Sequence, residues 1–184
     1  NLGVEGMMII GAVCGFIAAV TSGSPWLGFV FGAICGAALS MIFAILTQYL
    51  MANQVASGLG LTLFGLGFAA LLGHSYVGIN PPQFHSIHIP VLSDLPIVGP
   101  LLFGHDPMIY ISIFMVFAVW YFLNRTRAGL VLRAVGENPA AVDTAGVSVV
   151  GLRFAAVAIC GLLCGIAGAY LATGLQAGFV KDMT

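Results

Sequence analysis

Unbroken apolar runs constrain this chain more than any other feature of its sequence. A helix that crosses the hydrocarbon core of a bilayer needs about 20 consecutive apolar residues. The chain carries several runs close to that length, at residues 6–21, 26–46, 55–72, 107–123 and 153–173. Only 6% of its 184 residues are charged, against about 25% in a soluble domain. The sequence therefore predicts a membrane protein and excludes an ordinary soluble domain.

The runs favour helices over strands. In lipid, every backbone N–H and C=O group must be satisfied within the protein, and a helix does this within one segment. A β-barrel would show alternating polarity in strands of about ten residues, and these runs show none. We expect an all-α, polytopic transmembrane helix bundle with about five spanning segments.

The links between the runs indicate orientation. The link 73–106 is long and holds prolines, four histidines and two aspartates, but no Lys or Arg. The link 124–152 holds three arginines, and Arg153 follows it directly. Positive residues stay on the cytoplasmic side of a membrane. The sequence thus predicts an extracytoplasmic loop at 73–106 and a cytoplasmic loop at 124–152.

Small residues recur on single helical faces. They are Gly11 and Gly15 in the first run, Gly28, Gly32, Gly36 and Ser40 in the second, and Gly161, Gly165 and Gly168 in the fifth. Small residues at this spacing let helix backbones approach closely in lipid. We expect tight helix packing within the bundle, with a dimerisation seam as the alternative.

Polar residues at membrane depth are few, and they are the candidates for a translocation path. Glu5 lies in "NLGVEG", whose two glycines favour a broken or re-entrant helix entry over regular helix. Glu5 either lines a path, as intramembrane ionisable residues often do, or serves as a structural cap. Asn53 suits an N-cap at the start of the third run. Asn53, Gln54 and Ser57 are weaker path candidates.

The segment "RTRAGLVLRAVGENPAAVDTAG" at 125–146 holds five of the chain's eleven charged residues. Asn138 followed by Pro139 is typical of a helix start, and Gly146 is a plausible stop. Residues 127–135 suit a second short helix, ended by Gly136. A two-turn helix is not stable alone in water, so it must dock on something. The alternative is a solvated loop that only sets topology.

No feature of the sequence indicates a chemical reaction. Its four cysteines lie within apolar runs and suit helix packing, and no cofactor, metal site or nucleic-acid partner is expected. The histidines His85 and His88 stand among prolines, which argues against a helical metal pair. The phosphate-binding pattern G-x-x-x-x-G-K-[ST] is absent.

Several motifs resemble one family. "RTRAGLVLRAVGENPAAVDTAGV" is similar to the cytoplasmic coupling segment of permeases in bacterial ABC importers, in the group that handles ribose, nucleosides and branched-chain amino acids. "NLGVEGMMIIGA" resembles that group's motif near its second spanning helix, and "ANQVASGLGLTLFGLG" and "LSDLPIVGPLLF" resemble its nucleoside and simple-sugar branch. The resemblance covers nearly the whole chain. It implies that residues 1–184 are part of one transmembrane permease domain.

The resemblance also implies a function. We expect a permease subunit of an ATP-binding-cassette importer that forms the translocation path for a nucleoside or simple sugar, in a bacterial inner membrane. The alternative is an ion-coupled secondary transporter or channel. The permease would not be an enzyme, because a separate ATP-binding subunit would hydrolyse ATP.

The family's other parts and its coupling residues carry over as expectations. The expected partners are that ATP-binding subunit, a second permease subunit, an extracytoplasmic substrate-binding protein and membrane lipid. The resemblance implies that coupling to the ATPase uses Gly136, Glu137, Asn138, Pro139, Ala140 and Ala141. Arg133 and Asp143, in the same segment, are expected to take part in the coupling as well.

Overall fold

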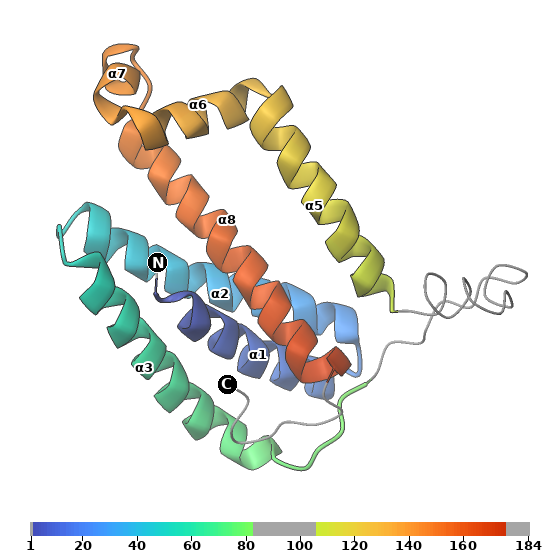
Figure 1. The fold of residues 1–184 in the computed structure, drawn as a ribbon. Helices are drawn as coiled ribbons and strands as arrows, with labels where there is room; N and C mark the ends of the chain where they lie inside the picture. The colour runs from blue at the N-terminus through green and yellow to red at the C-terminus, as the bar shows by residue number, and fades with distance from the viewer. Residues whose placement is uncertain (1, 83–105, 176–184) are drawn as a thin grey trace, which may run out of the picture. The chain divides into compact units, whose positions relative to one another are not determined.

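The structure is a computed structural model that describes residues 2–82 and 106–175. Every regular element within these ranges is helical (Figure 1). The α-helices are α1 (Val4–Ser22), α2 (Pro25–Gln48), α3 (Gln54–Gly73), α5 (Pro107–Arg125), α6 (Arg127–Glu137), α7 (Pro139–Thr144) and α8 (Val149–Tyr170). A short 3₁₀ turn, His74–Tyr76, follows α3, and a π turn, Leu171–Leu175, follows α8.

Five of these helices, α1, α2, α3, α5 and α8, are long and apolar enough to cross a membrane. They match the five apolar runs to within a few residues, which confirms the predicted polytopic helix bundle. The described chain forms two compact units. One contains α1, α2, α3 and α8, and the other contains α5, α6 and α7.

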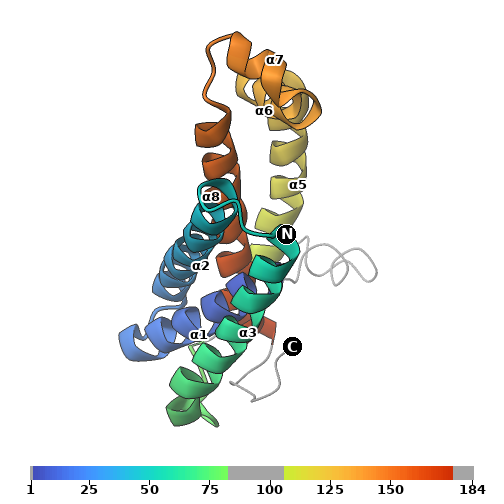
Figure 2. The ribbon, with the colours of Figure 1, turned by 90° about the vertical axis from the view of Figure 1, so that its left-hand side faces the viewer.

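Helix α1 occupies the middle of the first unit (Figure 2). At one level Gly11 of α1, Gly32 of α2 and Gly165 of α8 meet: a Cβ on Gly32 would lie 2.9 Å from the Gly11 carbonyl oxygen and 3.0 Å from that of Gly165. The predicted glycine rows therefore pack against one another within the chain. This is the tight packing expected of small residues in lipid, and it leaves these faces filled rather than free for a dimer seam.

The contacts between the glycine rows of α1, α2 and α8 follow one regular register. Gly36 lies against Gly161 and Gly165, and Gly32 lies against Gly165 and Ala169. Residue numbers that rise along α8 meet numbers that fall along α2, so these two helices are antiparallel. Gly11 meets Gly165 and Gly15 meets Ala169, so α1 and α8 are parallel.

Larger apolar side chains fill the rest of the core. The most buried include Met7, Val13 and Phe16 of α1, which pack toward α2, α3 and the end of α8. The buried hydroxyl groups of Ser40 and Thr47 donate to carbonyls of α2, and that of Thr173, in the π turn, donates to Ala169 O of α8. Each buried side-chain nitrogen or oxygen atom in the described part of the chain has a hydrogen-bond partner, as an apolar surrounding requires.

One local expectation is wrong: Gly136 does not end α6, because the helix runs on to Glu137. The irregular entry expected before the first run is limited to a turn at Leu2 and Gly3, and Glu5 and Gly6 lie inside the first turn of regular helix α1. Residues 83–105, which include most of the predicted outer loop with His85 and His88, lie outside the described residues.

Candidate functional site

Helices α5, α6 and α7 are joined by single residues. Thr126 ends α5 and begins α6, and Asn138 ends α6 and begins α7. The Asn138 side-chain oxygen accepts from the N–H of Ala141 at 3.1 Å, and its own N–H donates to Ala134 O at 2.9 Å. The predicted helix start at Asn138 and Pro139 is confirmed. Gly146, with φ +81°, follows the cap residue Ala145 after the helix.

The predicted coupling residues lie together on α6 and α7. Two apolar side chains, Val135 and Val142, are buried beneath them. Pro139 is half-buried, and the exposed members are Arg133, Gly136, Glu137, Asn138, Ala140, Ala141 and Asp143. The segment thus presents small and charged groups outward from an apolar interior, which suits contact with a polar protein surface better than with lipid.

The predicted path residues fall on two helices of the first unit. Asn53 is the N-cap of α3, and its Oδ1 accepts from the N–H groups of Val55 at 2.9 Å and Ala56 at 3.2 Å. The predicted capping role of Asn53 is confirmed. Gln54 is exposed and Ser57 is half-buried in the same first turn, while Glu5 is exposed in the first turn of α1.

At the side of the bundle where α1 begins, α2 and α8 extend further than α1 does, so the start of α1 lies inside the length of its two neighbours. From the level where Gly11, Gly32 and Gly165 meet, α1 extends seven residues back to Val4. From the same level α2 extends sixteen residues to Gln48, and α8 extends sixteen back to Val149. The nine-residue difference corresponds to about 13 Å at the helical rise of 1.5 Å per residue. Glu5 therefore lies well inside the span of α2 and α8.

The backbone at this helix start is tied to α3. The Thr62 hydroxyl lies 3.0 Å from the carbonyl oxygen of Leu2, and a Cβ on Gly6 would lie 2.6 Å from Leu61 O. Irregular backbone at membrane depth survives only when the protein satisfies its polar groups. The one hydroxyl proton of Thr62 is shared between Leu2 O and Gly58 O, which lies 3.2 Å away in its own helix. Sequence reasoning missed the contact with Leu2 because it depends on how α1 and α3 pack.

The ends of α2 and α8 are joined at one side of the bundle. An Arg153 guanidinium nitrogen lies 3.4 Å from Gln48 Oε1, and the rings of Tyr49 and Phe154 have centroids 5.3 Å apart. Sequence reasoning noted Arg153 as a topology signal but missed these partners. The separation of about a hundred residues hides them from any local pattern.

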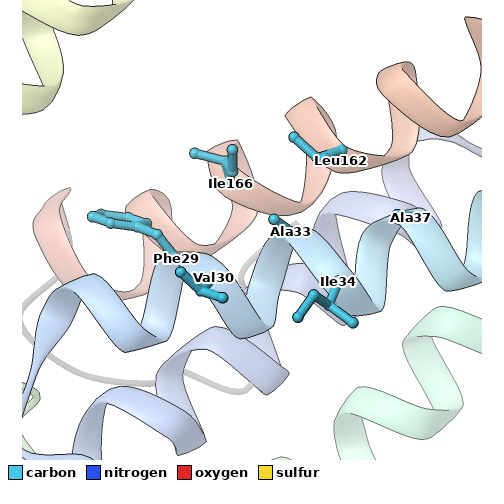
Figure 3. A pocket seen from close by; sticks show the side chains of 7 residues that line it. All are labelled: Phe29, Val30, Ala33, Ile34, Ala37, Leu162 and Ile166. Atoms are coloured by element: carbon cyan, nitrogen blue, oxygen red, sulfur yellow. The ribbon is translucent and has the colours of Figure 1, made fainter.

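An open apolar groove lies between α2 and α8 (Figure 3). It has a volume of about 440 Å³ and is lined by Phe29, Val30, Ala33, Ile34, Ala37, Leu162 and Ile166. These side chains offer no polar group. A hydroxyl-rich molecule placed there would lose its hydrogen bonds to water without replacement, so the groove suits hydrocarbon.

The fold and the exposed segment together define a class. Five apolar helices of spanning length, with tight glycine packing among α1, α2 and α8, define a multi-pass membrane protein. An exposed, capped helix pair, α6 and α7, lies between the spanning helices α5 and α8 along the chain. Comparison with known proteins identifies the family. The model of the family described as "Branched-chain amino acid transport system / permease component" matches residues 1–184, and the chain belongs to that family.

Similar proteins carry related names. The chain is 41% identical, over its whole length, to a putative glucose ABC transporter permease protein of Haloferax volcanii. It is 35% identical over 97% of its length to a nucleoside ABC transporter permease protein of Lactococcus lactis, and 32% identical over 99% to a guanosine ABC transporter permease protein of Bacillus subtilis. It spans 57%, 60% and 61% of these relatives, respectively. No solved structure matches the chain.

Proposed function

We propose that this chain is part of the permease subunit of an ATP-binding-cassette importer. The observation that carries the proposal is the exposed helix α7, capped by Asn138 and held between two spanning segments. Its six residues are too few for a stable isolated helix. The family match and the names of the relatives support the same reading, and none of them favours an ion-coupled secondary transporter.

The α7 surface is the proposed dock for a separate ATP-binding subunit. Ala140 and Ala141 present methyl groups that let a partner approach closely, and Glu137 and Asp143 flank them with charge. Complementary charge at such an edge orients a partner and suppresses wrong ones. The ATP-binding subunit hydrolyses ATP, and this chain contributes no catalytic residue and no cofactor of its own.

Transport then follows alternating access. Closure of two ATP-binding subunits moves α7, and the motion passes to α5 and α8, the spanning helices on either side of it in the chain. A second permease subunit completes the path, and an extracytoplasmic substrate-binding protein delivers the solute. The assembly lies in the inner membrane of a bacterium, with the 124–152 loop in the cytoplasm.

The proposed solute is a nucleoside or a simple sugar. The relatives named for glucose, nucleosides and guanosine support this class. The described spanning helices carry almost no charge, and a charged solute would require a counter-charge in lipid. Neutral, hydroxyl-rich solutes need hydrogen-bonding groups instead.

Glu5 is the strongest of the proposed path residues. Its helix start lies about 13 Å short of the ends of α2 and α8, so its carboxylate lies inside the length over which those two helices cross the membrane. An exposed carboxylate at that depth has access to a water-filled path and accepts hydrogen bonds from hydroxyl groups. Asn53, Gln54 and Ser57 line the path nearer the cytoplasm.

A matched pair of substitutions tests the docking proposal. Ala141→Arg places a bulky charge on the exposed face of α7, and Ala128→Arg makes the same change at an exposed position in the first turn of α6. In a detergent pull-down of the full-length protein, we expect Ala141→Arg to lose the ATP-binding subunit and Ala128→Arg to retain it. Capture by both variants, or by neither the parent nor the variants, would refute the proposal.

A further inference from the structure

The junction between α5 and α6 consists of one residue, Thr126. Its backbone is extended, with φ −111° and ψ 152°, while the residues on both sides are helical. A β-branched side chain suits an extended backbone. Since peptide bonds are planar, the direction of α6 relative to α5 depends chiefly on these two dihedral angles. Figure 1 shows the sharp change of direction at this point.

The Thr126 hydroxyl holds both helices. Its Oγ1 donates to the carbonyl oxygen of Phe122 in α5 at 2.6 Å and accepts from the N–H of Gly129 in α6 at 3.1 Å. A hydroxyl has one donor and two acceptor lone pairs, so it makes both bonds at once. Any rotation about the junction stretches at least one of them.

Gly129 lets the two backbones meet. It is buried, and it lies against the carbonyl group of Phe122 and the Cα of Leu123. A Cβ at Gly129 would lie 2.7 Å from that Cα, closer than real Cβ atoms come to other atoms. The first turn of α6 therefore packs directly on the backbone of the last turns of α5, with no side chain at Gly129 to separate them.

A third connection lies further from the junction. A guanidinium nitrogen of Arg133, in the second turn of α6, donates to Asn124 Oδ1 at 3.2 Å. The Asn124 side-chain nitrogen donates in turn to Trp120 O at 2.8 Å. This connection joins α6 to two successive turns of α5. Because it lies off the Thr126 backbone, it resists bending that the junction alone would allow.

We propose that this elbow, made by Thr126, Gly129, Asn124 and Arg133, is a rigid link that converts displacement of α7 into movement of α5. The inference rests on the proposed function, because α7 must be displaced by a docked subunit. A flexible joint would absorb the displacement locally, whereas a triply braced joint passes it to the spanning helix. Thr126 and Asn124 are positioning residues, since they touch neither solute nor partner in this role.

The first experiment measures rigidity without any partner. Spin labels are attached at Phe114→Cys in α5 and Glu137→Cys in α6, in full-length permease whose native cysteines are replaced, in lipid nanodiscs. Pulsed electron–electron double resonance then gives the distribution of distances between the two spin labels. The double variant Thr126→Val with Asn124→Ala loses the side-chain bonds across the elbow. We expect alternative elbow angles to gain about tenfold in population, seen as a broader distribution.

Two controls isolate the elbow. Thr126→Ser keeps the hydroxyl and should keep the narrow distribution. Ser112→Ala removes a hydroxyl that donates only to Ile109 O within α5, so it matches the loss of one bond without touching the junction. If the double variant disturbs folding, Thr126→Val and Asn124→Ala are measured separately, and each should broaden the distribution less than the pair would. A distribution that stays narrow in the double variant, or in both single variants, would overturn the proposal.

The second experiment measures coupling in proteoliposomes that contain the ATP-binding subunit. We expect the elbow variant to retain that subunit while the amount of solute moved per ATP falls several-fold, with Thr126→Ser and Ser112→Ala unchanged. An unchanged ratio despite a broadened distribution would overturn the role in transmission. If the parent captures no ATP-binding subunit, the proposed function fails and the transmission role fails with it. A failure confined to the elbow leaves capture intact.

Discussion

Gly32 and Gly165 meet backbone to backbone across the interface of α2 and α8, with room for no side chain between them: a Cβ on Gly32 would lie 3.0 Å from the Gly165 carbonyl oxygen. Gly11 of α1 joins them at the same level, where a Cβ would lie 2.5 Å from the Gly165 Cα. In lipid, where burial of apolar surface drives little association between helices, such close contact is a main source of cohesion.

Gly165→Ala should destabilise the bundle by about 1–3 kcal/mol, because the added methyl group forces the helices apart. Gly60→Ala, on an exposed face of α3 where nothing lies within 4 Å, is the matched control. It should leave stability unchanged or raise it by about 0.5–1 kcal/mol, since Ala is the better helix former. Thermal unfolding in detergent measures both. Equal melting temperatures for the two variants would contradict the packing argument.

Tyr49 and Phe154 should couple energetically across the ends of α2 and α8, because their rings lie 5.3 Å apart. A double-mutant cycle with Tyr49→Ala and Phe154→Ala should give a coupling free energy of about 0.5–1.5 kcal/mol. A second cycle that pairs Tyr49→Ala with Trp26→Ala, at the opposite end of α2, should be additive within about 0.5 kcal/mol. Additivity in the first cycle would show that the ring contact contributes nothing.

Asn138→Ala should unfold α7 locally. The substitution removes the acceptor of the Ala141 N–H and costs about 1 kcal/mol, typical of a lost N-cap. Hydrogen-deuterium exchange of residues 139–144 should become faster, while exchange in α2 stays unchanged. Asn138→Asp retains a side-chain oxygen acceptor and should protect α7 as well as the parent does. Equal exchange in the Ala and Asp variants would rule out capping as the reason for Asn138.

Substitutions at Glu5 and at Glu137 should impair different activities, solute transport and capture of the ATP-binding subunit, respectively. Glu5→Gln, inside the span of α2 and α8, should lower solute transport several-fold and leave capture of the ATP-binding subunit intact. Glu137→Gln, beside the exposed face of α7, should weaken capture and lower transport only in consequence. Each variant serves as the control for the other in transport and pull-down assays. If Glu5→Gln no longer captured the ATP-binding subunit, the proposal that Glu5 lines the translocation path would be contradicted.

The two sides of the membrane should be distinguishable by labelling. Ser75→Cys, in the exposed turn after α3, and Ala145→Cys, in the exposed turn after α7, are introduced separately into a cysteine-free background. In intact cells a membrane-impermeant maleimide should modify Ser75→Cys alone, and Ala145→Cys should react only after the membrane is opened. The reverse pattern would invert the proposed orientation.

The sequence by itself determined the spanning helices and the caps of the exposed segment. Apolar runs of bilayer length define α1, α2, α3, α5 and α8, because lipid forces the backbone into helix wherever the side chains are apolar. The α7 start was equally local, since a capping side chain and the N–H group it accepts from are three residues apart. Glycine spacing also showed which helical faces pack, because periodicity is preserved in the sequence.

The partners of those faces were decided only by the tertiary structure. Glycine rows do not say which helix they meet, and the convergence of Gly11, Gly32 and Gly165 depends on the paths of three helices. The hydroxyl of Thr62 near Leu2 O, the pairing of Arg153 with Gln48 and the depth of Glu5 follow from the same packing. Each joins residues far apart in the chain, and the close approach of helix backbones, rather than any local propensity, brings them together.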